Sequence, residues 1–291
     1  MHYKRCLTAA SVAALAGTVA VSTVAANAST ARPRLARAPG AAPATSLPRI
    51  NVAMNGKKIT VSGALQSGGV RIVSTVTREP QGDPIFVRLD PGVTLAQFFA
   101  LLHSGAASDP NNLDGTAAIV TDAQANKGTS RIQANLKAGQ YVAFDTVRSN
   151  AAKWPFTTFK IATAKHPAVL PRPAATIAAI EFGFRGPGTL HRGDLVRFAN
   201  HGFLVHMIVF ATASSHRNAR KIARYLHEGR QGKARHLATG TGTFAGPLSH
   251  GAHQQLVVHH RGWYVLACFM ETQDGRDHTR LGMERVIHIV R

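Results

Sequence analysis

Short runs of apolar residues alternate with polar, turn-forming residues along most of the chain. The runs are rich in β-branched and aromatic side chains, and Gly, Pro or Asn bounds most of them, which is typical of β-strands. On this pattern we predict strands over residues 70–76, 84–89, 130–136, 139–144, 156–162, 194–198, 205–210, 254–258, 262–267 and 285–290. The chain is therefore expected to be all-β.

Two segments carry a helical period in place of the β pattern. Thr94 and Gln97 form a capping-box signature before an apolar face, and Gly105 supplies a stop. Ser215 is a candidate N-cap for a second helix that runs to about Gly229. The buried stripe of this second helix is predicted to be Ile222, Ala223 and Leu226, and basic residues fill its other face and the next loop: Arg217, Arg220, Lys221, Arg224, Arg230, Lys233 and Arg235.

A Pro-rich segment over residues 166–173 divides the chain into two parts whose elements follow the same order. Each part has two strands, then a helix, then three strands, although few residues are identical between the parts. This repetition predicts two tandem Greek-key β-sandwiches, each with one inserted helix. We place a first domain at 49–165, a linker at 166–173 and a second domain at 174–291.

The N-terminal segment has the features of a secretory signal peptide. A basic start is followed by an apolar stretch from Leu7 to Ala26, and Ala26-Asn27-Ala28 has the small-x-small form of a cleavage site. We predict a signal peptide at 1–28 and a secreted, periplasmic or envelope-associated protein. An uncleaved membrane anchor is the alternative, although Thr and Ser weaken the apolar core. Residues 29–48, rich in Ala, Pro and Arg, are predicted to be a flexible linker.

Removal of the signal peptide would take Cys6 with it and leave Cys268 as the one cysteine of the mature chain. Exported proteins usually pair their cysteines as disulfides, which one cysteine within a chain cannot do. The readings that remain are an inert buried thiol, a bridge to another molecule and a metal ligand. The neighbourhood of His278 and Met283 favours a metal ligand. His206, in an apolar run far upstream, completes a set of two His, one Cys and one Met, which is the ligand set of a blue-copper site.

The segments 193–206, 262–268 and 278–290 together resemble the cupredoxins, the family of plastocyanin and azurin. Members of that family place one His after a strand and a Phe-x-Asn turn, and the other three ligands on the loop between the last two strands. The resemblance covers about residues 174–291. It implies that His206, Cys268, His278 and Met283 bind one copper ion, with Met270 as the alternative to Met283. It also implies electron transfer, in which Cys268 and His278 conduct charge to a surface edge.

Two departures from the family pattern are visible. Nine residues separate Cys268 from His278, a longer spacing than small cupredoxins use, so residues 272–277 must bulge outwards for His278 to return to the site. The first part has Asp83-Pro84 where His206 would fall and residues 146–156 where the ligand loop would be. We interpret the first domain as a degenerate copy without metal ligands.

The formal net charge of +20 indicates an anionic partner. The candidates are an acidic redox partner protein or an anionic envelope polymer that docks on the basic helix at 215–229, and nucleic acid is not expected. HExxH, paired Cys-x-x-Cys and GxSxG motifs are absent, so metalloprotease, zinc-finger and α/β-hydrolase functions lack their residues. We expect an electron-transfer protein and no enzyme, and the alternative is a metal-free or copper-storing module for binding or adhesion. A multicopper oxidase is disfavoured because its His-x-His pairs are absent.

Overall fold

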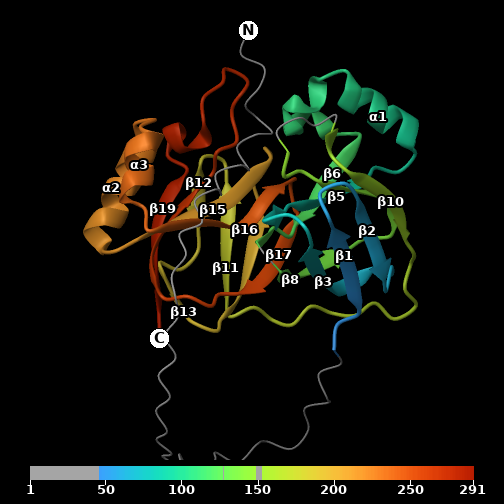
Figure 1. Cartoon of the computed structure of the whole chain (residues 1–291), viewed down its shortest axis with the longest axis horizontal. Helices are drawn as coiled ribbons and strands as arrows, with labels where there is room; N and C mark the ends of the chain where they lie inside the picture. Colours follow the sequence, from blue (N-terminus) through green and yellow to red (C-terminus); the bar gives the residue numbers. More distant parts are fainter. Residues whose placement is uncertain (1–45, 127, 149–152) are drawn as a thin grey trace, which may run out of the picture. The chain divides into compact units, whose positions relative to one another are not determined.

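The computed structural model describes residues 46–126, 128–148 and 153–291. The predicted signal peptide at 1–28 and most of the predicted linker at 29–48 lie outside these described residues. The described part of the chain is built mainly of β-strands, with α-helices inserted in each half (Figure 1). The predicted all-β sandwich fold is confirmed.

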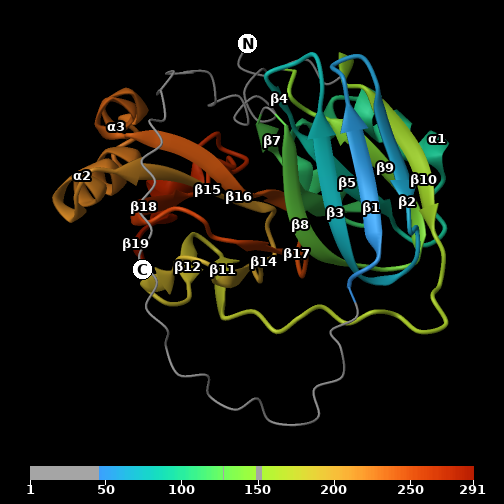
Figure 2. The same ribbon diagram turned by 60° about the horizontal axis from the view of Figure 1, so that its bottom comes forward.

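The first half packs a sheet with the order β2-β1-β3-β8 against a sheet with the order β10-β9-β5-β6. Figure 2 shows β1, β2 and β3 side by side. The bounds are β1 Arg49–Met54, β2 Ile59–Gly63, β3 Gly68–Val76, β5 Pro84–Leu89, β6 Ala117–Asp122, β8 Thr129–Leu136, β9 Gly139–Asp145 and β10 Phe156–Ile161. A short pair, β4 Gln81–Gly82 with β7 Ala125–Asn126, stands beside them.

The second half repeats this plan, with β12-β11-β14-β17 in one sheet and β13-β19-β18-β15-β16 in the other. The bounds are β11 Ala175–Ile180, β12 Gly183–Arg185, β13 Thr189–His191, β14 Leu195–Asn200, β15 His206–Ala213, β16 Gly240–Leu248, β17 His253–Val257, β18 Gly262–Ala267 and β19 Glu284–Val290. β11 pairs with β14 in parallel, as β1 does with β3. By strand order, β5 therefore corresponds to β15 and β9 to β18.

The two halves share one sheet, because edge strand β8 pairs antiparallel with edge strand β17. Hydrogen bonds between the halves reinforce this junction: the Ser249 N–H donates to the Ile119 carbonyl at 2.9 Å, and the Asp122 N–H donates to Oε1 of Gln254 at 3.0 Å. One apolar core contains side chains from both halves. Closing the edge strands against each other removes exposed backbone groups that would pair with other chains. The placement of a domain boundary at 166–173 stays a prediction.

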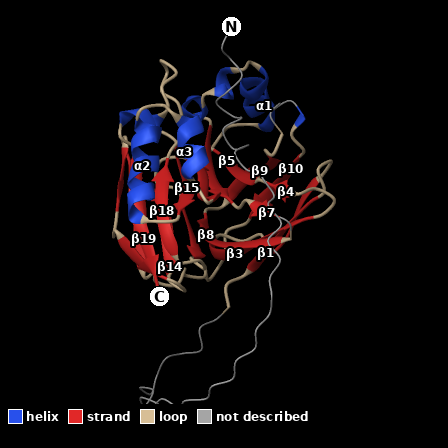
Figure 3. Cartoon of the chain, turned by 60° about the vertical axis from the view of Figure 1, so that its left-hand side comes forward, coloured by secondary structure: helices blue, strands red, loops and turns tan. Residues whose placement is uncertain are grey.

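The two predicted helices begin where the sequence indicates. Helix α1 (Leu95–His103) has the predicted capping box between Thr94 and Gln97. Helix α2 (His216–His227) begins after Ser215, whose side chain accepts from the Asn218 N–H, and it buries Ala219, Ile222 and Leu226. Figure 3 shows α2 with a further helix, α3 (Gln231–Leu237), in a segment that we expected to be a loop. The N-cap position of α3 is Arg230, which makes no side-chain cap, so the sequence carried no start signal for it.

Helix α2 covers the sheet that contains β15, β18 and β19, and it also contacts the 3-10 turn η5 (His278–Leu281). Its apolar side packs with Val265 and Ala267 of β18. Among the described residues, no helix is long and apolar enough to cross a bilayer.

Candidate metal centre

His206 is the first residue of β15, and a fixed loop leads into it. Asn200, at the end of β14, holds that loop from inside: Nδ2 donates to the Leu204 carbonyl at 2.7 Å, and Oδ1 accepts from the Gly202 N–H at 2.9 Å. The imidazole is buried. By bonding these backbone groups of the loop, the Asn200 amide fixes where the chain enters β15.

Cys268 follows the last residue of β18 and is fully buried. Its Sγ accepts a hydrogen bond from the Met207 N–H at 3.4 Å. Its own N–H donates to the Met283 carbonyl, and its carbonyl accepts from the Thr279 N–H, both at 3.2 Å. Backbone hydrogen bonds therefore hold the end of β18, where the thiol lies, against residues 279 and 283.

The residues between Cys268 and His278 form a turn closed by its own hydrogen bonds. The Thr272 N–H donates to the Arg276 carbonyl at 2.9 Å, and Glu271 pairs with Asp277 across the base. The His278 N–H then donates to the Met270 carbonyl at 2.8 Å. The nine residues between Cys268 and His278 therefore bulge away from the end of β18, and His278 lies again beside that strand end. Gly282, with φ of +103°, ends the following turn in the left-handed conformation that glycine favours.

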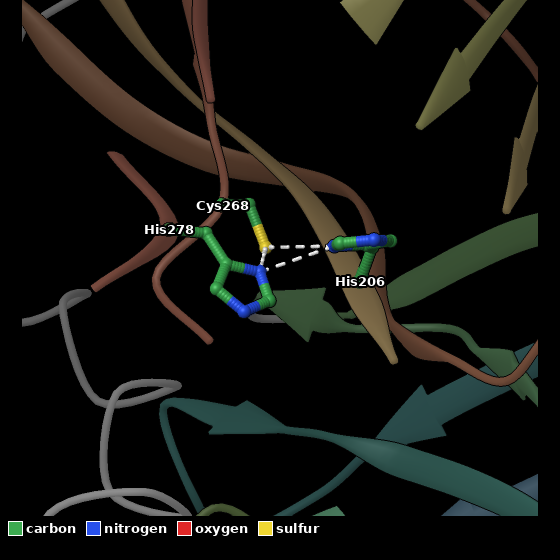
Figure 4. A group of neighbouring side chains, drawn as sticks. All are labelled: His206, Cys268 and His278. Carbon is green, nitrogen blue, oxygen red and sulfur yellow. Dashed lines mark hydrogen bonds between the residues drawn. The ribbon is translucent and has the colours of Figure 1, made fainter. Parts of the chain in front are cut away.

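Three donor atoms converge at this point (Figure 4). Nδ1 of His206 lies 3.1 Å from Nδ1 of His278, and Sγ of Cys268 lies 3.8 Å and 3.5 Å from these two nitrogens. In the described part of the chain, no other group of three His, Cys, Asp or Glu side chains comes as close together.

The spacing of these atoms fits one metal ion between them. Donors that each lie roughly 2.1 Å from an ion, at trigonal angles, are separated from one another by about 3.6 Å. The three observed separations are close to that value. Two imidazoles with one thiolate are the trigonal set of blue-copper sites. The donor set and its spacing therefore suit copper.

Burial sets the protonation of the three ligands. It lowers the pKa of His206 to about 4, with a smaller contribution from His278, and it lowers the pKa of His278 to about 4. Burial also raises the pKa of the Cys268 thiol to about 12. Both imidazoles are therefore neutral at pH 7, the form that binds a metal, whereas the thiol needs a nearby cation to lose its proton.

The imidazoles are covered from the outside. His278 is fully buried, and the ring of Phe182 meets it edge-on at 5.1 Å between centroids. A Cβ on Gly202 would lie 2.8 Å from Nε2 of His206, so glycine is required there. Within the described residues, Nε2 of both histidines has no hydrogen-bond partner. The expected surface edge at His278 is therefore not observed, because Phe182 lies over the ring.

Both methionine candidates are buried beside the three donors. The Met283 N–H donates to the His278 carbonyl at 3.0 Å, and the Met283 carbonyl accepts from Cys268. Met270 belongs to the same apolar core and bonds His278 through its carbonyl. The backbone of Met283 thus bonds both Cys268 and His278. An axial role for either thioether stays a prediction.

The matching place in the first half holds oxygen atoms. Asp83 directly precedes β5 and Thr146 directly follows β9, the strands that correspond by order to β15 and β18. The Thr146 hydroxyl donates to Oδ2 of Asp83 at 2.9 Å. A polar pair thus lies at these strand ends, and our interpretation of this half as a degenerate copy stays a prediction.

No family model and no curated protein matches this chain. Solved structures of copper proteins do. Reduced auracyanin from the photosynthetic bacterium Roseiflexus castenholzii is 16% identical at a TM-score of 0.25, over 39% of this chain and 94% of that one. The copper-containing nitrite reductase of Thermus scotoductus SA-01 is 12% identical at 0.25, over 85% and 68%. A multicopper oxidase of Pseudomonas thermotolerans is 12% identical at 0.23, over 85% and 69%.

These comparisons correct one expectation. We expected no enzyme, yet two of the similar structures that cover 85% of the chain are enzymes by name, a nitrite reductase and a multicopper oxidase. The exclusion of an enzymatic role is therefore wrong.

The two buried ligand histidines are expected to destabilise the copper-free protein as the pH is lowered from about 6.5 to about 4. Histidine has an ordinary pKa of 6.5, and in the fold the pKa of His206 and of His278 is about 4. Between these values these two residues bind more protons in the unfolded chain than in the folded one, so their contribution favours unfolding in acid. Urea unfolding at a series of pH values measures the effect. The His206→Asn variant should lose less stability across the window than wild type, and equal losses would contradict the prediction.

Proposed function

We propose that this chain is an exported electron-transfer protein that holds one copper ion in its second half. His206, Cys268 and His278 would hold the ion, and Met283 would supply a fourth, weaker donor. The observation that carries the proposal is the triangle of two Nδ1 atoms and one Sγ atom, all buried and spaced for one ion. Bound copper supplies the exchange of one electron between its two oxidation states.

The protein's part is to hold these donors still. The Asn200 amide fixes the entry into β15, backbone bonds attach Cys268 to residues 279 and 283, and the Met207 N–H donates to Sγ. Donors held by such a network keep their positions when the charge on the ion changes, which favours fast electron exchange. Burial also excludes water from the site, which strengthens the interaction between the thiolate and a cation.

Copper titration of the purified full chain tests the proposal. We expect one Cu(II) per chain and an intense visible thiolate-to-copper absorption band that disappears on reduction and returns on oxidation. A protein that takes up no stoichiometric copper would contradict the proposal. Zn(II) is the matched control, because it suits the same donors and gives no such band.

One observation favours the copper-storing alternative. His278 is fully buried beneath Phe182, so the imidazole edge that we expected to exchange electrons is covered. Stoichiometric Cu(I) binding without a reversible coloured Cu(II) form would support storage. Fast oxidation of the reduced copper form by a soluble oxidant would support electron transfer.

The basic face of α2 and α3 is our proposed docking surface for an acidic redox partner. Arg217, Arg220 and Arg224 are exposed, whereas the apolar side of α2 packs on the sheet that bears Cys268. Gln231 of α3 donates to Asp277, the residue before His278, at 2.7 Å. An anionic oxidant should therefore react faster than a cationic one, and salt should reduce the difference. Equal rates for the two oxidants at low salt would oppose this docking surface.

Export is a separate part of the proposal and rests on the predicted signal peptide at 1–28. Mass spectrometry of the protein from its native host should find a mature chain that begins at Ser29. Recovery of an intact N-terminus would contradict cleavage.

A further inference from the structure

A loop of the first half reaches the residue next to His206. The 3-10 turn η3 (Pro110–Leu113) lies between α1 and β6, and Oδ1 of Asn111 accepts a hydrogen bond from the Val205 N–H at 2.6 Å. Val205 immediately precedes His206 and is buried. One side chain from the first half therefore fixes the backbone from which the imidazole projects.

Asp109 sets the orientation of the Asn111 amide. Oδ1 of Asp109 accepts from the Asn111 N–H at 2.9 Å and from its Nδ2 at 2.8 Å. Because Nδ2 is bonded to Asp109, the amide oxygen must be the atom that faces Val205. The two side chains thus act as a unit, and the orientation of one depends on the other.

The same loop is anchored in the apolar core. Pro110 and Leu113 are buried, and Leu113 packs in a cluster that includes Met207 and Cys268. The loop that carries Asn111 is therefore held by buried contacts in the same core as the site.

We propose that Asp109 and Asn111 are positioning residues for the copper site in the second half. Asn111 holds the chain at Val205 and so sets the position of the His206 imidazole, while Asp109 orients the Asn111 amide. This inference rests on the proposed copper function. The first half would thus have a role in the copper site of the second half, through the hydrogen bond from Val205 to Asn111.

The Asn111→Ala variant tests the hydrogen bond to Val205. Partners of this kind, one bond removed from the ligands, change metal affinity by about 10–100-fold, so we expect copper affinity to fall about tenfold and the thiolate-to-copper band to shift. Asn112→Ala is the matched control, because Asn112 is exposed on the same turn and its amide donates to the Ala106 carbonyl. The control should keep the affinity and the band of wild type.

The Asp109→Ala variant tests the orientation of the Asn111 amide. It removes the oxygen that accepts from the Asn111 N–H and from its Nδ2, so copper affinity should fall as it does in Asn111→Ala. Asp114→Ala is the matched control, because Asp114 is exposed and directly follows η3, and it should keep the affinity of wild type.

A copper-free readout separates this inference from the proposed function. Alkylation of Cys268, followed by peptide mass spectrometry, should be several-fold faster in Asn111→Ala than in Asn112→Ala. Loss of the Asn111 bond would release the chain at Val205, two residues before the Met207 N–H that donates to Sγ. If wild type forms no coloured copper complex, the proposed function fails while the alkylation rates still test the role of Asn111. If wild type is coloured but both variants match it in affinity, band and alkylation rate, the inference is overturned.

Discussion

Replacement of Cys268 with serine should abolish the intense visible absorption of the copper-loaded protein and weaken copper binding by at least about 100-fold. The band arises from charge transfer between the thiolate and copper, and a serine hydroxyl is a hard donor that stays protonated near neutral pH. Outer partners of metal ligands alone change affinity by about 10–100-fold, so loss of a direct ligand should exceed that range. The side chains are nearly equal in size, which keeps the buried position filled. Copper titration and visible spectroscopy measure both effects.

In the full chain with residues 1–28 retained, Cys6→Ser is the control for this experiment. It makes the same substitution at the other cysteine of the chain, within the predicted signal peptide. The control should bind copper with the band of wild type. A Cys268→Ser protein that retains the band would show that the thiolate of Cys268 is not the ligand.

Replacement of Gly246 with alanine should lower the free energy of unfolding by about 3 kcal/mol, the upper part of the range for overpacking a close-packed interior. Gly246 lies in β16, and a Cβ there would lie 1.5 Å from Oδ2 and 2.4 Å from Cγ of Asp122 in β6. Asp122 is buried, and its N–H bonds to Gln254. Its carboxyl cannot move away without disturbing the junction of the two halves.

Gly232→Ala is the matched control for the glycine substitution. Gly232 lies in α3, and a Cβ added there would meet no heavy atom within 4 Å. Because alanine favours a helix over glycine, the control should be neutral or more stable by up to about 1 kcal/mol. Urea unfolding of the three proteins measures the differences. Equal stability of Gly246→Ala and wild type would show that β6 and β16 separate easily.

The protonation of Asp122 explains why so tight a contact is stable. Burial raises the pKa of Asp122 well above its ordinary range, and the charge of Asp83 acts in the same direction. Burial also raises the pKa of Asp83. A neutral carboxyl is far less costly to bury than a charged one, so the Asp122 side chain can lie against the backbone of β16.

Local signals in the sequence were sufficient for many elements of the fold. The strands that carry the ligands, β15, β18 and β19, follow β-branched runs, and the caps of α1 and α2 follow Thr94 and Ser215. Several strands were missed, among them β2 and β6, which carry β-branched residues, and β16. β16 contains Gly and Pro residues that are unfavourable inside a strand, and its pairing with β15 supplies what its own sequence does not.

The order of His206, Cys268, His278 and Met283 determined by itself that copper chemistry was the hypothesis to test, because these donor types and their strand context are readable without coordinates. Only the tertiary structure decided how far apart the donors lie, that Phe182 covers His278, and that Asn111 of the first half holds the chain before His206. Asn111 and Val205 are 94 residues apart and share no local pattern. Their contact exists because the two halves pack on one core, and such packing depends on the whole chain.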